Sequence, residues 1–149
     1  MAKKTFKGRI VLPGKVTGKA TVSRQPFNTT GSYYDNCFAG KTDSAPCTDV
    51  NNKELFGKEL SGAILCLSTT IGSTTGGMCL MGMKAIGVGP EALLFSKPID
   101  TLAAAGVLMA DIWKDERIVT IDMLGDEFLE AVKMGDPISV KEDGTVEVG

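Results

Sequence analysis

GAILCLSTTIGSTTGGMCLMGMKAIG, residues 62–87, decides how this chain folds. It opens with GAILCLS, a short continuous apolar run that is typical of a strand buried on both faces. Six Gly, Ser and Thr residues follow at 72–77, and MCLMGMKAIG at 78–87 then predicts a short helix. A buried strand that passes through a loop into a helix is half of a βαβ unit. The stretch therefore predicts an α/β fold with parallel strands.

The alternation of buried strands and helices continues downstream. ALLFS at 92–96 and RIVTID at 117–122 predict two more buried strands. Between them, IDTLAAAGVLMADIW at 99–113 predicts a helix, with Pro98 well placed near its start. DEFLEAVK at 126–133 predicts another helix, because acids fill its first turn and a lysine its last.

Both ends of the chain read as β structure. KTFKGRIVL at 4–12 and KATVSR at 19–24 predict two strands, and PISVK at 137–141 with TVEV at 145–148 predicts a hairpin. The predicted class is α/β, with a largely parallel central sheet, short helices and additional antiparallel strands.

Residues 25–58 break this pattern. They are rich in turn-forming residues and show no sustained period. Structureless loops this long are uncommon inside compact domains and are usually functional or mobile. We therefore expect a long loop at about 25–58, with Tyr33 and Tyr34 as the best candidates for exposed aromatics that contact a partner or substrate.

Composition limits the function classes. A length of 149 residues favours one domain over residues 1–149, and 43% apolar with 23% charged residues is typical of a soluble globular protein. A net charge of −2 gives no general attraction to nucleic acid or to an anionic membrane. No segment reaches the ~20 apolar residues of a membrane helix, and no apolar stretch of signal-peptide length opens the sequence. We expect a cytoplasmic protein without nucleic-acid or membrane partners.

The sequence contains no histidine, which excludes Ser-His catalysis and the commonest metal ligand. The four cysteines, Cys37, Cys47, Cys66 and Cys79, lack the spacing of a zinc or iron–sulfur ligand set. We expect no metal or cofactor site in this chain. If it contributes to an active site, a partner must complete that site.

The loop at 72–77 is the candidate site. In open α/β sheets, ligands bind beyond the carboxyl ends of strands, and helix N-termini favour anions. Gly72 permits close backbone approach to a ligand, and Ser73, Thr74 and Thr75 supply three hydroxyls. Equally, Ser73 could simply cap the helix, and the pattern is neither a P-loop nor GxGxxG. The residues alone leave both interpretations open.

Four blocks, in this order, resemble the small subunit of aconitase X enzymes: GRIVLPGKVTGKA (8–20), GAILCLSTTIGSTTGG (62–77), KPIDTLAAAGVLMADIW (97–113) and GDPISV (135–140). The resemblance covers nearly the whole chain. It implies a swivelling β/β/α domain that docks on a large catalytic subunit to form a hydro-lyase, a dehydratase of a small hydroxy acid. Known members include mevalonate 5-phosphate dehydratases and cis-3-hydroxy-L-proline dehydratases.

The resemblance also implies roles for residues. Ser73 would be the catalytic base, with Gly72, Thr74 and Thr75 around the substrate, and the large subunit would carry the iron–sulfur cluster. A serine is a poor base unless its alkoxide is stabilised, and neighbouring N–H groups at a helix N-terminus are one way to do so.

Two departures from the family pattern bear on the substrate. Thr69-Thr70-Ile71 stands where members often carry a basic residue before the Gly-Ser pair, and Gly77 stands where many have serine. The missing basic residue favours a substrate such as cis-3-hydroxy-L-proline. The alternatives are mevalonate 5-phosphate, or a non-catalytic anion-binding or interaction module.

Several further residues have simple structural interpretations. Asp100 is expected to complement the N-terminus of its helix, and Asp111 to cap or pair locally. Trp113 and the methionines Met78, Met81 and Met83 are expected to lie in the core rather than at an interface.

Overall fold

The computed structural model describes residues 2–149. The strands are β1 (Lys4–Lys7), β2 (Arg9–Leu12), β3 (Val16–Ser23), β4 (Phe27–Asn28), β5 (Ile64–Leu67), β6 (Thr70–Ile71), β7 (Ala92–Phe95), β8 (Val119–Asp122), β9 (Pro137–Val140) and β10 (Thr145–Val148). The helices are α1 (Thr29–Ser32), α2 (Tyr34–Phe38), α3 (Thr75–Ala85), α4 (Thr101–Lys114) and α5 (Asp126–Ala131).

The main sheet has the order β1-β10-β9-β3-β5-β7-β8-β2. Its centre, β3-β5-β7-β8, is parallel, and β2, β9, β10 and β1 add antiparallel strands. The long strand β3 belongs to both halves of the sheet. Its residues Val16–Lys19 pair with β9 in the antiparallel half, and Ala20–Ser23 pair with β5 in the parallel half. The α/β class with a largely parallel centre, predicted from the sequence, is confirmed.

The single strand predicted at 4–12 is two strands. β1 pairs with β10, whereas β2 pairs with β8 at the opposite end of the sheet order. The break falls at Gly8, where an added Cβ would collide with the carbonyl oxygen of Asp122 and lie 2.9 Å from the Ile121 side chain. Only a glycine lets the chain pass this close to β8, and the bend carries it from one half of the sheet to the other.

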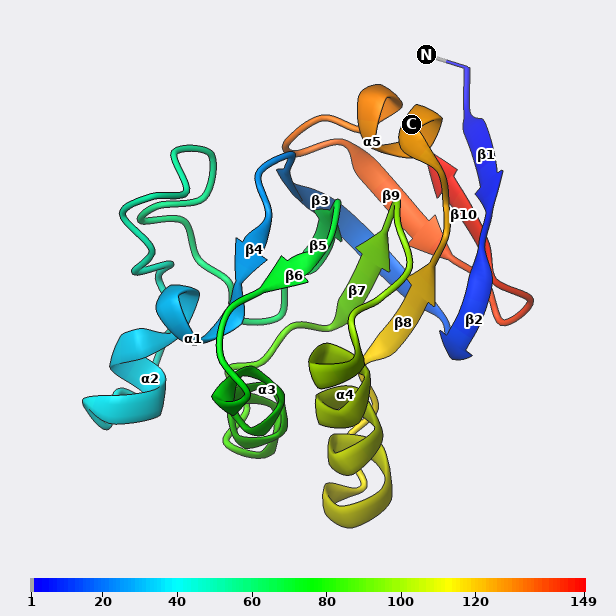
Figure 1. Cartoon of the computed structure of the whole chain (residues 1–149). Helices are drawn as coiled ribbons and strands as arrows, with labels where there is room; N and C mark the ends of the chain where they lie inside the picture. The colour runs from blue at the N-terminus through cyan, green and yellow to red at the C-terminus, as the bar shows by residue number, and fades with distance from the viewer. Residues whose placement is uncertain (1) are drawn as a thin grey trace.

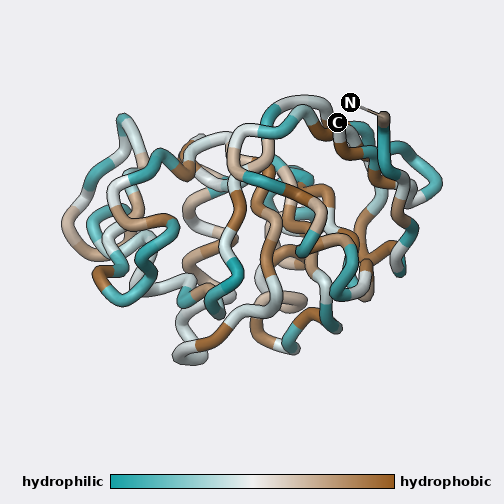
Figure 2. Tube along the Cα trace, turned by 90° about the horizontal axis from the view of Figure 1, so that it is seen from above, coloured by the Kyte–Doolittle hydropathy of each residue, from teal (hydrophilic) through white to brown (hydrophobic). Residues whose placement is uncertain are grey.

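The two halves of the sheet and the helices form three layers. Ile64 and Cys66 of β5 face the core between the two halves, whereas Leu65 and Leu67 face the core under α3 and α4. This explains the continuous apolar run, since β5 is buried on both faces. Figure 1 shows α3 and α4 together on one face of the sheet, and Figure 2 shows apolar segments gathered in the middle of the molecule.

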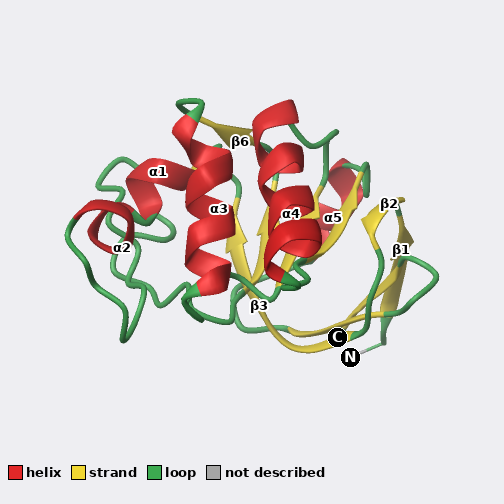
Figure 3. Cartoon of the chain, turned by 90° about the horizontal axis from the view of Figure 1, so that it is seen from below, coloured by secondary structure: helices red, strands yellow, loops and turns green. Residues whose placement is uncertain are grey.

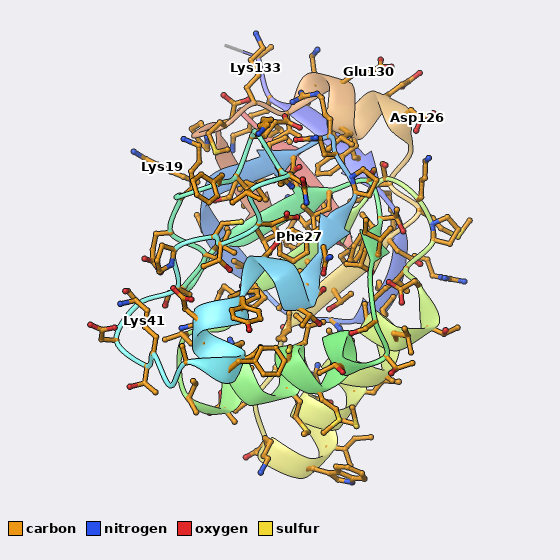
Figure 4. All side chains as sticks on the ribbon, turned by 60° about the vertical axis from the view of Figure 1, so that its left-hand side comes forward. Lys19, Phe27, Lys41, Asp126, Glu130 and Lys133 are labelled. Atoms are coloured by element: carbon orange, nitrogen blue, oxygen red, sulfur yellow. The ribbon has the colours of Figure 1, made fainter. Side chains whose placement is uncertain are left out.

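The segment 25–58, expected as a long loop, is ordered and only partly a loop. Residues 27–38 form β4, α1 and α2, residues 39–58 form no helix or strand, and Phe27, Tyr33 and Leu55 are fully buried. Figure 4 places Phe27 in the interior, behind α1. Side chains satisfy part of its backbone, as when Asn36 Nδ2 donates to the carbonyl oxygens of Lys41 and Ser44 at 2.9 and 2.8 Å. Its apolar residues are irregularly spaced, so the segment shows no period although it packs into the core.

Exposure corrects three other expectations. Tyr33 is buried, and only its neighbour Tyr34 is exposed, at 54%. Met78 and Trp113, expected in the core, are 62% and 71% exposed. Asp111 does pair locally, accepting a hydrogen bond from Arg117 Nη2 at 3.0 Å.

None of the helices within residues 2–149 combines the length and the apolar character needed to cross a bilayer; the longest, α4, has 14 residues.

Candidate active site

A cavity of about 270 Å³ lies where the loop after β5 enters α3 and where α4 begins. Its walls come from three stretches that are distant in the sequence: Thr29; Thr70, Ile71, Gly72, Ser73 and Gly76; and Asp100, Thr101, Leu102 and Ala103. The site lies beyond the carboxyl ends of β5 and β7, the place where open α/β sheets bind ligands.

The segment 25–58 holds the loop in place. β4 pairs with β6 in parallel, with Phe27 opposite Thr70 and Asn28 opposite Ile71. Gly72 follows with φ of +115°, and an added Cβ would lie 2.8 Å from Asn28 Oδ1. Both the backbone angle and the close approach to Asn28 therefore require glycine at position 72.

The N-terminus of α3 opens on this cavity without a side-chain cap. The helix begins at Thr75, three residues earlier than predicted, and its N-cap residue Thr74 has helical φ and ψ and no capping hydrogen bond. Ser73 is exposed, and its carbonyl oxygen accepts from Gly76 N at 3.0 Å. No acidic residue lies in the first turn. The positive end of the helix dipole thus faces the cavity uncompensated by local side chains.

The N-terminus of α4, in contrast, is capped by a side chain. Asp100 Oδ1 accepts hydrogen bonds from Leu102 N at 2.7 Å and Ala103 N at 3.1 Å, as expected from the sequence. Just upstream, Ile99 N donates to the buried Asp122 at 2.7 Å, and Asp122 also pairs with Arg9, which raises the pKa of Arg9. Among the described residues that line the cavity, Asp100 is the only charged one.

Two glycines bring the helices together. An added Cβ at Gly77 would lie 2.5 Å from the Leu102 carbonyl oxygen, and one at Gly106 would lie 2.6 Å from the Gly77 carbonyl oxygen. Backbone therefore packs on backbone, and both N-termini reach the same cavity. Figure 3 shows the two helices side by side. A serine at position 77 would therefore not fit this packing.

Thr70 was not identified from the sequence as a site residue. It is 6% exposed, it lines the cavity, and within residues 2–149 its Oγ1 has no hydrogen-bond partner. Because buried hydroxyls are nearly always partnered, Thr70 becomes a candidate for contact with a ligand in this cavity. Thr29, which is buried and also lines the cavity, was missed as well, because nothing in the segment 25–58 signalled that it folds against the loop.

Of the predicted site residues, Gly72 and Ser73 line the cavity. Thr74 and Thr75 do not line it, since they form the N-cap and the first residue of α3, and their contact with substrate stays a prediction. The role of Ser73 as base stays a prediction too.

The cysteines do not build a metal centre. Burial raises the pKa of Cys66 and Cys47, and burial together with a hydrogen bond to Cys79 raises the pKa of Cys37 to about 12. Within residues 2–149 no three His, Cys, Asp or Glu side chains are grouped to hold a metal ion. The residues described, 2–149, therefore do not fit the iron–sulfur cluster that the resemblance implies.

Residues 5–148 match the family described as the aconitase X swivel domain. The chain belongs to this family. Among curated relatives, the phosphomevalonate dehydratase small subunit of Archaeoglobus fulgidus is 29% identical over 144 residues, covering 96% of this chain and 97% of that protein. The corresponding subunit of Thermococcus sibiricus is 28% identical, covering 92% and 98%.

A solved structure agrees with the family. The crystal structure of the holo-form of aconitase X from Thermococcus kodakaraensis superposes with a TM-score of 0.80 at 26% identity, covering 98% of both chains. The aconitase X swivel domain seen here is therefore the small subunit of a dehydratase of this family, a hydro-lyase subunit that works with a large subunit.

Proposed function

We propose that this chain is the small subunit of a phosphomevalonate dehydratase, with Ser73 as the base that removes a proton from the substrate carbon. The substrate comes from the relatives named above, which match this chain over nearly its full length. The observation that carries the role of Ser73 is its position on the cavity beside the uncapped N-terminus of α3.

Dehydration of a 3-hydroxy acid breaks a C–H bond next to the carboxylate and a C–O bond at the neighbouring carbon. The proton goes to Ser73 Oγ, which has to enter the reaction as the alkoxide. The N-terminus of α3 favours that anion through its dipole and its free N–H groups. Because no side-chain hydrogen bond caps α3 among the described residues, the N–H groups at its N-terminus are left to stabilise the Ser73 alkoxide.

Departure of the hydroxyl group needs a second group that this chain does not place at the cavity. Asp100, the charged residue on the cavity wall, already accepts two backbone hydrogen bonds as the cap of α4. We therefore assign the hydroxide-accepting half of the site, together with the iron–sulfur cluster implied by the family, to the large subunit.

A second candidate substrate is cis-3-hydroxy-L-proline. One observation favours it: no Lys or Arg is among the described residues that line the cavity, so a phosphate group finds no basic side chain on this subunit. For phosphomevalonate, the phosphate has to be held by the N-terminus of α3 or by the large subunit.

The test is turnover by the complex of this chain with its large subunit, assayed with each substrate. Ser73→Ala is expected to lower kcat by about 10²–10⁴-fold, with the complex and the circular dichroism spectrum unchanged. Ser139→Ala, which removes a hydroxyl on β9 away from the cavity, is the matched control. If Ser73 only caps the helix, its alanine variant keeps its turnover and loses about 1 kcal/mol of stability.

A further inference from the structure

α4 is apolar on every side. Its sequence, TLAAAGVLMADIWK, contains only two charged residues, Asp111 and Lys114, both in its last turn. The inner face packs on α3 and the sheet through Ala103, Gly106, Val107 and Ala110. A helix that is apolar all round is normally buried all round, yet the outer face of α4 is exposed.

The outer face forms a stripe, which we call the α4 stripe: Thr101, Ala105, Leu108, Ile112 and the adjoining Trp113. The first four follow the spacing i, i+4, i+7 and i+11, so they lie on one side of the helix. Leu108 is 41% exposed, and Ile112 and Trp113 are each 71% exposed. No charged residue interrupts the stripe over about 16 Å of helix.

Asp111, one of the two charged residues of α4, is fixed by an ion pair. Asp111 is held by Arg117, whose Nη1 also donates to the carbonyl oxygen of Pro13 at 2.9 Å. An apolar centre with a fixed ion pair at its edge has the arrangement of a protein–protein interface. Val50, by contrast, is an exposed apolar residue whose sequence neighbours Asp49, Asn51 and Lys53 are polar, as is ordinary on a protein surface.

The α4 stripe is continuous with the candidate active site. Thr101 begins the stripe and also lines the cavity, together with Asp100 and Leu102. A subunit that covers the mouth of the cavity therefore meets the first turn of α4 and can continue along it. Figure 3 shows α3 beside α4, with α1 and α2 on the far side of α3, away from α4.

We propose that the α4 stripe is a docking surface for the large subunit, with Ile112 and Trp113 as its anchoring side chains. The proposal rests on the proposed function, because the large subunit is placed over the cavity there. The occupant is an apolar surface of the large subunit that begins at the mouth of the active site and buries the outer face of α4.

The experiment measures the Kd between the purified large subunit of the same organism and variants of this chain. Ile112→Lys is expected to weaken binding by about 30-fold or more, as a buried hot-spot side chain does. Val50→Lys, a matched change at an exposed apolar residue outside the stripe, is expected to leave Kd unchanged. Thermal unfolding of both variants shows that they are folded, and Trp113→Ala gives a second variant without new charge.

The outcomes separate the two proposals. Loss of binding by Ile112→Lys, with turnover restored at saturating large subunit, supports the docking surface, because the cavity is intact in that variant. Unchanged Kd for both Ile112→Lys and Trp113→Ala overturns it, whatever Ser73→Ala does to turnover. A Kd that responds to Phe38→Lys on α2 but not to the stripe variants also overturns it. So does sedimentation of the isolated chain as a dimer that Ile112→Lys dissociates.

Discussion

The N-termini of α3 and α4 open on the same cavity, but only that of α4 is capped by a side chain. At α4 the carboxylate of Asp100 occupies two backbone N–H groups. At α3 no side chain caps the helix, and Ser73 lies beside the free end. A capped end is complete within the protein, whereas an uncapped end has hydrogen-bonding capacity left for a ligand. The contrast distinguishes a helix start that is complete within the chain from one that, under the proposed function, stabilises the base.

The largest expected effect comes from separating the two helices. Gly77→Ala places a methyl group 2.5 Å from the Leu102 carbonyl oxygen, so α3 and α4 have to move apart. We expect a loss of about 1–3 kcal/mol in the free energy of unfolding, measured by urea denaturation. Turnover by the complex should fall as well, because the two N-termini no longer meet at one cavity.

Gly82→Ala is the matched control in the same helix. An added Cβ at Gly82 has no atom within 4 Å, so the substitution improves helix propensity without a clash. It should raise the free energy of unfolding by about 0.5–1 kcal/mol. Equal stability of the two variants would contradict the close backbone packing of α3 on α4.

The second-largest expected effect comes from the hydroxyl of Thr70, in the cavity between the N-termini of α3 and α4. Thr70→Val keeps the shape of the side chain and removes its unpartnered hydroxyl. If that hydroxyl binds substrate, KM for the complex should rise about tenfold, equivalent to about 1.4 kcal/mol, with kcat changed much less. The free energy of unfolding should stay the same or rise, because no protein hydrogen bond is lost.

Ser96→Ala separates substrate binding from burial. Ser96 is also 6% exposed with an unpartnered hydroxyl, but it does not line the cavity. Its alanine variant should leave KM unchanged. A KM that responds equally to both variants would mean that Thr70 acts on the fold rather than on the substrate.

The sequence predicts one helix end better than the other. Asp100 stands immediately before a long apolar helix, and Asp is a preferred N-cap residue. Its capping role therefore follows from local rules. The start of α3 is hidden in the run at 72–77, because Gly76 and Gly77 are poor helix formers and their helical state depends on packing against Thr29 and α4. Local propensity could not show this.

The same division holds for the rest of the molecule. GAILCLS at 62–68 predicts β5 because burial on both faces leaves a direct mark on composition. Thr29 reaches the cavity through the pairing of β4 with β6, a contact between residues 43 positions apart that no period reveals. Trp113 was expected in the core because large apolar residues are usually buried. Its exposure depends on how α4 packs in the fold, which the local sequence does not show.

The smallest expected effect comes from a direct comparison of the N-cap residues of α4 and α3. Asp100→Ala removes a cap with two hydrogen bonds and should lower the free energy of unfolding by about 1 kcal/mol. Thr74→Ala changes the N-cap residue of α3, whose side chain makes no capping bond, and should stay within about 0.5 kcal/mol of wild type. Urea denaturation of both variants measures the difference. If Thr74→Ala costs as much as Asp100→Ala, then α3 is capped in solution, and its N-terminus loses the free N–H groups on which the alkoxide of Ser73 depends.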